Sequence, residues 1–374
     1  MSTPQEHPSF QYAHAVFAGG GVRGIAHVGA LEVAEQFGYR WDHVAGTSAG
    51  AIIAALVAAG YNVKELASIM QEIDYSRFAT SPDYDLLHIT ELSNILTQGG
   101  LHDGSYIEAF VREKLQAKGV YTFGDLLVKG QEQLPDLFQR YRLTVIVSDI
   151  TQGRIVRLPQ DAHLYGIDPN ALDVAWAVRM SASIPFFFIP LQLTDANGTR
   201  SCIVDGGLLS NFPLFLFEHT TAAQNNTPTI PTIGFQLVDT SQQYAVSEND
   251  KDRNVFTSIN SNIGKNRNVS APCGIDMLKA LVSTMLSAHD KLYMNDETFA
   301  HTIAIPTNGI ASTQFDLTKE QAQQLYESGK AAATTFFKTW DAEAYRATYG
   351  SGNIPTTSRL AQVHESMKQQ AQKF

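Results

Sequence analysis

The sequence is poor in cysteine, in clustered positive charge and in long apolar runs. Its two cysteines, Cys202 and Cys273, lie far apart, form no zinc-binding spacing and fit a reducing compartment. The first residues combine no basic segment with an apolar one, so we expect no secretory signal. The longest apolar run follows Ser48 and is too short to span a bilayer. These absences predict a cytoplasmic protein whose membrane contact, if any, is peripheral.

The charge balance excludes further classes of protein. The formal net charge is −10, and no dense cluster of Lys and Arg occurs, which argues against nucleic acid as the main partner. Any membrane contact would therefore have to be apolar. With 44% hydrophobic and 17% charged residues, the chain has the composition of a folded globular protein. No cluster of metal ligands is visible, so we expect neither a metal nor a cofactor in the chemistry, and the oligomeric state is not indicated.

The order of the predicted elements indicates an α/β fold. A strand at residues 12–18 leads through a glycine loop into a helix at 25–37, and a short strand at 43–45 leads into a helix at 51–59. This succession predicts strands that are buried on both faces by helices. Residues 142–149 and 154–158 read as a hairpin, so the sheet should be mixed but mainly parallel. Further strands are expected at 201–204, 232–238 and 301–305, and a closing helix at 318–340.

The same patterns predict how the chain is divided. We expect an N-terminal tail at residues 1–11, a catalytic core at 12–220, and a C-terminal part of the same domain at 221–340. Residues 239–274 are rich in Asn, Ser and Asp and should form a polar insertion. Residues 75–104 lose clear periodicity, which is consistent with a covering insertion. A polar tail would occupy residues 341–374.

Ser48 is the first candidate for chemistry. It lies in Gly46-Thr47-Ser48-Ala49-Gly50, which has the G-x-S-x-G form of a nucleophile elbow, where a sharp turn between strand and helix exposes a serine hydroxyl. Gly46 and Gly50 would keep that turn uncrowded. A serine hydroxyl still needs a base to take its proton and N–H donors for the oxyanion of the intermediate.

The donors are predicted upstream. Gly19-Gly20-Gly21 can present backbone N–H groups, and Val22 and Arg23 begin the helix that follows. The same stretch also fits G-x-G-x-x-G, the dinucleotide fingerprint, with Asp42 near the acidic offset, so a nucleotide-binding protein is an alternative of a different class. Two details disfavour it: Asp42 precedes the apolar strand residues instead of ending the strand, and the fingerprint does not require the Arg23 cation.

For the base, both histidine and aspartate must be considered. His219, His289 and His301 lie downstream of the elbow, but none has a loop signature. Asp205 ends a predicted strand, and Gly206 and Gly207 clear space after it. The same Asp-Gly pair between apolar residues is also a hairpin signal, so a turn without chemistry is the alternative.

Taken together, the three motifs resemble the patatin-like phospholipase family. Residues 19–24 match its G-G-G-x-R-G loop, residues 46–50 its G-x-S-x-G elbow, and residues 205–207 its D-G-G/A box, in the same chain order. The resemblance covers about residues 12–220. It implies a three-layer α/β/α fold with a central mixed, mainly parallel sheet.

The resemblance also implies a mechanism. Ser48 would be the nucleophile and Asp205 the base, without a catalytic histidine, and the oxyanion hole would come from residues 19–23. The implied substrate is a lipid acyl ester, cleaved in the manner of a phospholipase A or lysophospholipase. A general carboxylesterase or thioesterase on the same site is the nearest alternative, and a catalytically idle family member is another. Phe186, Phe187 and Phe188 would line an acyl pocket or belong to the core.

Overall fold

The computed structural model describes residues 10–73, 77, 100–195, 197–218, 230–238 and 300–349. The predicted polar insertion at 239–274, nearly all of the predicted insertion at 75–104, His219 and His289 lie outside this part of the chain. No helix within the described residues is both long enough and apolar enough to cross a membrane.

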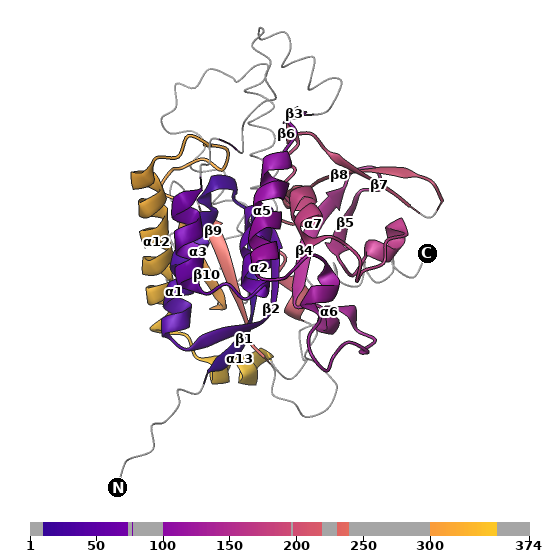
Figure 1. Ribbon diagram of the computed structural model, residues 1–374. Coiled ribbons are helices and arrows are strands. Elements are labelled where there is room, and N and C mark those ends of the chain that lie inside the picture. The colour runs from indigo at the N-terminus through magenta and orange to yellow at the C-terminus, as the bar shows by residue number, and fades with distance from the viewer. Residues whose placement is uncertain are drawn as a thin grey trace, which may run out of the picture.

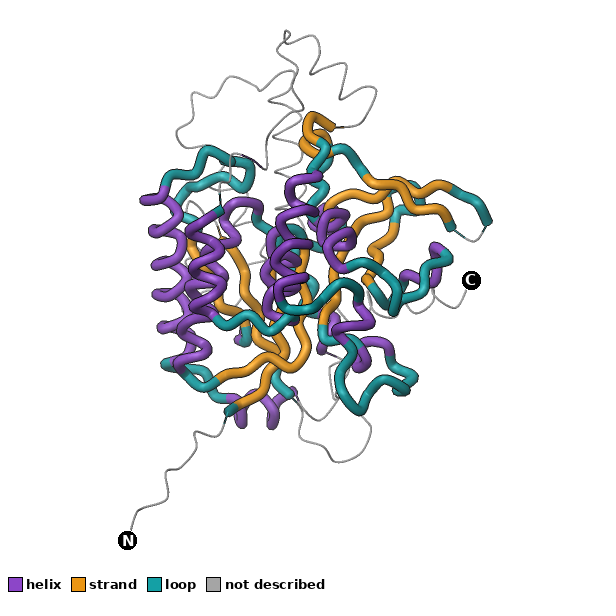
Figure 2. The backbone as a smooth tube through the Cα atoms, in the orientation of Figure 1, coloured by secondary structure: helices purple, strands orange, loops and turns teal. Residues whose placement is uncertain are grey.

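The described strands form a mixed sheet that is mainly parallel, as the sequence predicts (Figures 1 and 2). Five neighbouring strands run parallel in the order β10, β9, β1, β2, β4, and β5, β8 and β7 continue the sheet in antiparallel pairings. A separate pair is formed by β3 and β6. The bounds are β1 Gln11–Phe17, β2 Tyr39–Thr47, β3 Gly100–His102, β4 Leu143–Asp149, β5 Arg154–Leu158, β6 Phe186–Phe188, β7 Leu191–Thr194, β8 Arg200–Asp205, β9 Thr232–Val238 and β10 Thr302–Pro306.

Helices flank this sheet, and α12, α1 and α3 lie side by side in Figure 1. The α-helices are α1 Ile25–Gln36, α2 Ala49–Ala58, α3 Val63–Glu72, α5 Ser105–Ala117, α6 Leu137–Arg140, α7 Val174–Ser181, α8 Phe215–Glu218, α12 Lys319–Phe337 and α13 Ala342–Tyr349. Short 3₁₀ helices occupy Gly21–Gly24, Phe123–Leu126, Ala162–Tyr165 and Gly206–Leu208. The fold is thus the α/β arrangement that the succession of strand and helix patterns predicts.

Alternation along β1 separates two apolar clusters on the two faces of the sheet. Ala13, Ala15 and Phe17 belong to the large core beneath the helices. Val16 belongs to a smaller cluster with Phe217 of α8, on the opposite face. Because successive side chains of a strand point to opposite faces, β1 is buried on both sides.

Four local features differ from the sequence-based prediction or were left open by it. β2 begins at Tyr39 rather than at residue 43, because its first part pairs with β1. β6 and β7 were not expected, and their partners β3 and β8 are distant in sequence. Asp205 is followed by the 3₁₀ helix Gly206–Leu208 instead of a hairpin. The predicted polar tail contains α13, whose Tyr345 packs against Trp340.

Candidate active site

Ser48 stands at a strained turn between β2 and α2. Its φ of 55° and ψ of −125° lie in a region that costs a non-glycine residue about 1–3 kcal/mol. The flanking glycines make the turn possible: a Cβ on Gly46 would lie 2.3 Å from the carbonyl oxygen of Gly50, and a Cβ on Gly50 would lie 2.3 Å from that of Phe17. The local geometry is therefore that of a nucleophile elbow.

A buried serine holds this elbow from behind. The Ser48 N–H donates to Oγ of Ser181 over 2.9 Å, and the Ser181 hydroxyl donates to the carbonyl oxygen of Ile146 over 2.6 Å. Ser181 ends α7 and thus connects that helix to both β2 and β4. Nothing local in the sequence around Ser181 indicates this long-range contact.

Asp205 is the buried carboxylate beside Ser48. It ends β8, is 1% exposed, and accepts a hydrogen bond from the Gly207 N–H over 2.7 Å through Oδ1. Its other oxygen, Oδ2, makes no hydrogen bond within 3.5 Å to the residues that the structure describes. Burial raises the pKa of Asp205 to about 7, against the opposing effects of the Ser48 hydroxyl and the Gly207 N–H. The Ser48 hydroxyl is therefore close enough to lower the pKa of Asp205, although the two side chains do not form a hydrogen bond of normal geometry.

Two contacts fix the backbone around Asp205. Its N–H donates to the carbonyl oxygen of Ser183 over 2.8 Å. A Cβ on Gly206 would lie 2.2 Å from the carbonyl oxygen of Ile146, so this position admits only glycine without rearrangement. The D-G-G sequence thus brings the carboxylate close to β4, the strand between β8 and β2.

The glycine loop lies directly against the elbow. A Cβ on Gly19 would stand 3.1 Å from Cβ of Ser48, and Gly21 has a positive φ of 57°. The N–H groups of Gly19, Val22 and Arg23 are already bonded, to the carbonyl oxygens of Asn211, Ser312 and Gly20 respectively. Those of Gly20 and Gly21 donate to no acceptor within the described residues.

Two side chains hold the loop in this shape. His27 is fully buried, and its Nε2 lies 2.9 Å from the carbonyl oxygen of Ala18. Burial lowers the pKa of His27 to about 4, so the neutral ring donates this hydrogen bond from Nε2. Nε of Arg23 donates to the carbonyl oxygen of Gly20 over 3.0 Å, which orients the loop from within.

The structure does not bring the candidate histidine His301 to Ser48. It precedes the amino end of β10, at the edge of the sheet, whereas Ser48 follows the carboxyl end of β2. The ring is 2% exposed and contacts Tyr345 at a centroid distance of 5.3 Å. Burial lowers the pKa of His301 to about 4. His301 is a buried packing residue.

Asp42 does not occupy the position of a dinucleotide-binding acid. It lies within β2, away from the carboxyl end of the strand, and its Oδ2 lies 2.9 Å from Nδ1 of His43. The loop and Asp42 therefore do not form the pair that the dinucleotide fingerprint requires.

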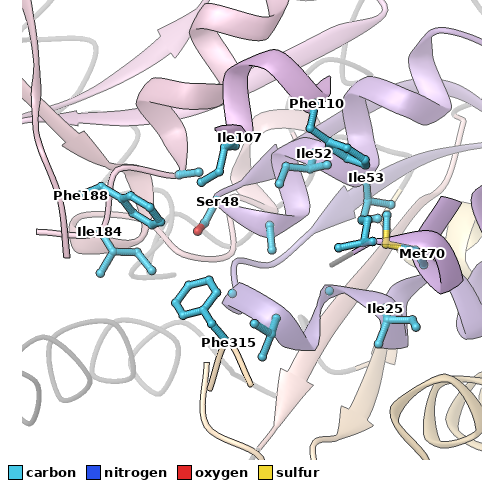
Figure 3. Close-up of a pocket in the computed structure, with 16 residues that line it drawn as sticks. Ile25, Ser48, Ile52, Ile53, Met70, Ile107, Phe110, Ile184, Phe188 and Phe315 are labelled. Atoms are coloured by element: carbon cyan, nitrogen blue, oxygen red, sulfur yellow. The ribbon is translucent and has the colours of Figure 1, made fainter. Parts of the chain in front are cut away.

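An apolar pocket opens beside Ser48, as Figure 3 shows. It encloses about 580 Å³ of empty space when the volume is counted out to its open mouth. Of the three predicted phenylalanines, Phe188 lines the pocket. Phe187 stacks on another lining residue, Phe315, at 4.9 Å, and Phe186 is 39% exposed. Phe315 itself was not expected, because it follows β10, far along the chain.

A sheet of this kind, with a serine elbow after a central parallel strand, is typical of α/β hydrolases. The model of the patatin-like phospholipase family matches residues 15–217. The chain is 36% identical to the uncharacterized protein YqhO of Bacillus subtilis over 88% of this chain and 99% of that one. It is 27% identical to a cUMP-AMP-activated phospholipase of Escherichia coli, over 55% of this chain and 58% of the other.

Among solved structures, VipD from Legionella pneumophila matches with a TM-score of 0.49 and 16% identity, covering 89% of this chain and 67% of VipD. The family model covers more than half of the chain, so the chain belongs to the patatin-like phospholipase family. It is accordingly a hydrolase of lipid acyl esters.

Proposed function

We propose that the protein cleaves acyl esters of phospholipids or lysophospholipids through a Ser48/Asp205 dyad and an acyl-enzyme intermediate. The observation that carries this proposal is the meeting of three features at one point. The strained Ser48 hydroxyl, the buried Asp205 carboxylate and the mouth of an apolar pocket all adjoin the same turn. No histidine of the described residues takes part.

The proton would move between these two side chains. Oγ of Ser48 attacks the acyl carbonyl carbon while Oδ2 of Asp205 accepts the hydroxyl proton. As the bond to the leaving alcohol breaks, Asp205 returns that proton to the alcohol oxygen, and Ser48 holds the acyl group. Water then attacks the acyl-enzyme, giving its proton to Asp205, and the fatty acid leaves as the proton returns to Ser48.

The raised pKa of Asp205 makes this assignment chemically reasonable. A carboxylate with an ordinary pKa near 4 is a weak base, whereas a general base works best when its pKa lies near the working pH. Burial, which raises the pKa of Asp205 to about 7, supplies this property. The unsatisfied Oδ2 of Asp205 is the atom that can take the proton.

Backbone N–H groups would stabilise the tetrahedral intermediate. Gly20 and Gly21 have N–H groups without an acceptor in the described residues, in the loop that reaches Ser48 through Gly19, so we assign the oxyanion hole to these two within the predicted residues 19–23. Gly19, Val22 and Arg23 then shape the loop through their own hydrogen bonds. Each donor of this kind contributes about 3 kcal/mol to lowering the barrier.

The apolar pocket favours a lipid over a small polar ester. Its described lining consists almost wholly of apolar side chains and glycine, and Ser48 lies among them, between Phe188 and Ile52. An acyl chain can therefore leave water as the ester reaches the nucleophile, a gain of about 0.8 kcal/mol for each buried methylene group. A short-chain carboxylesterase would not draw on this pocket.

Lipid-product mass spectrometry tests the proposal. Wild type, Ser48→Ala and Asp205→Asn are incubated with mixed vesicles of phospholipids, lysophospholipids and neutral glycerides. The proposal predicts free fatty acid and the matching lysolipid or glycerophosphodiester with wild type, and nearly none with either variant. Turnover of neutral or thioester substrates alone would contradict the lipid assignment, and full activity in Asp205→Asn would contradict the dyad.

A further inference from the structure

A β-bulge brings three titratable side chains together in the middle of β1 and β2. Ala13 pairs with Trp41 and Ala15 with Val44, so His14 alone lies opposite both Asp42 and His43. In a regular strand these two neighbours would point to opposite faces. The extra residue lets both side chains approach His14, which is the usual effect of a bulge.

The donor atoms of this cluster are close. Oδ2 of Asp42 lies 2.9 Å from Nδ1 of His43 and 3.9 Å from Nδ1 of His14. One donor atom from each of the three residues lies within 4.8 Å of the others. Both histidines are almost wholly buried, at 6% and 5% exposure, whereas the Asp42 side chain is 28% exposed. The cluster therefore has one side open to solvent.

The hydrogen bonds within the cluster leave some of its nitrogen and oxygen atoms without a suitable partner. Nδ1 of His43 faces Asp42 and its Nε2 lies 3.2 Å from the carbonyl oxygen of Gln139, so both ring nitrogens face oxygen acceptors. A neutral imidazole has only one N–H and can satisfy only one of them. Nδ1 of His14 is buried without a hydrogen-bond partner in the described residues and points toward the same carboxylate. A cation among these three atoms would resolve both defects.

We propose that His14, Asp42 and His43 bind a divalent transition-metal ion of the Zn²⁺ type. Two imidazole nitrogens and one carboxylate oxygen are a ligand set that Zn²⁺ accepts, with the fourth position left to water on the open side. The Gln139 carbonyl then accepts a hydrogen bond from Nε2–H of His43, an outer contact that metal-bound histidines nearly always make.

The site would clamp the two strands that carry the predicted chemistry. Gly19 follows His14 by five positions along β1, and Ser48 follows His43 by five positions along β2. At about 3.3 Å per residue, the metal would sit about 16 Å from the elbow, too far for a part in the reaction. Its expected effect is therefore stability, because a ligand that binds only the folded state raises the melting temperature.

Zinc binding to the full chain tests this site directly. The protein is stripped with a chelator, and Zn²⁺ is titrated in while bound metal is counted by mass spectrometry and affinity is measured by calorimetry. We expect one tightly bound Zn²⁺, a higher melting temperature, and an affinity at least about 100-fold lower in His14→Gln and Asp42→Asn. His163→Gln is the matched control, because His163 is exposed and outside the cluster, and it should bind like wild type.

Cobalt supplies a readout that needs no variant. Co²⁺ bound by two imidazoles, one carboxylate and water should give the strong visible bands of a four-coordinate ion, and Zn²⁺ should displace it. Wild type that binds no more Zn²⁺ than His14→Gln, or Co²⁺ with the weak spectrum of the hydrated ion, would overturn the site. Neither measurement depends on ester hydrolysis, so this test stands apart from that of the dyad.

Discussion

Asp205 and Ser48 approach each other across β4, the strand that lies between theirs. Thr47, just before Ser48, pairs with Ile146 of β4, and Asp205 pairs with the next residue of β4, Val147. The two side chains therefore stand at adjacent positions along one strand, although 157 positions separate them in the sequence (205 − 48). Sheet register, rather than a flexible loop, fixes their distance.

The pKa of Asp205 sets the expected pH dependence of hydrolysis. Burial raises this pKa to about 7, and only the ionised carboxylate can accept the Ser48 proton. The value of kcat/KM should therefore fall about tenfold for each pH unit below about 7 and level off above about 8. Initial rates on a water-dispersed ester across this range measure the profile. A flat profile down to about pH 5 would mean that the base has an ordinary carboxylate pKa.

The same shift predicts a stability effect of Asp205→Asn. Because the folded-state pKa lies above the ordinary aspartate value of 3.8, the folded protein holds this proton more tightly, and the free energy of unfolding of the wild type falls as pH rises between the two values. Asn does not titrate in this range. The free energy of unfolding of Asp205→Asn, relative to that of wild type, should therefore rise by about 3 kcal/mol between about pH 5 and pH 8. Denaturant unfolding at the two pH values measures this gain. An equal difference at both would show that Asp205 does not titrate in this range.

Ser181→Ala should reduce turnover by loosening the elbow. It leaves the Ser48 N–H and the Ile146 carbonyl oxygen without their partner, at about 1–3 kcal/mol of stability for each buried group. Ser201→Ala is the matched control, since Ser201 is also fully buried but contacts Gln152 away from the site. We expect only Ser181→Ala to lower kcat. Equal kcat values in the two variants would remove Ser181 from the support of the elbow.

Met70→Phe should shorten the preferred acyl chain. Met70 lines the pocket at the end away from Ser48 in Figure 3, so a larger side chain there reduces the depth left for the chain. The ratio of long-chain to short-chain ester hydrolysis should fall by about tenfold or more. Ile69→Phe, on the same helix but outside the pocket lining, is the control for core overpacking. An unchanged ratio in Met70→Phe would mean that the chain binds elsewhere.

Much of the fold could be predicted from the sequence because the signals are local. The apolar run of β1, the glycines of the loop and the turn at Ser48 each depend on neighbouring residues, and so does the hairpin pattern of β4 and β5. These gave the mainly parallel sheet and the family motifs. They also gave Asp205 as a candidate, although its alternative as a hairpin residue was excluded only by the observed 3₁₀ turn.

The remaining features depend on contacts between distant segments. Ser181 and Phe315 reach the site from α7 and from beyond β10, and no local pattern marks either residue. The bulge that brings His14 and His43 together exists only in the pairing of two strands, so no pattern within either strand indicates this cluster. Likewise, the hydrogen bond from the Val22 N–H to the carbonyl oxygen of Ser312 could not be predicted, because Ser312 lies far along the chain.

The most direct test of the account is to find which residue carries a covalent adduct. A fluorophosphonate probe reacts with activated serine hydroxyls, and peptide mass spectrometry of the labelled protein locates the modified side chain. The account predicts a single adduct on Ser48, no labelling of Ser48→Ala, and slow labelling of Asp205→Asn. An adduct on another serine, or labelling that survives in folded Ser48→Ala, would contradict the claim that Ser48 is the nucleophile.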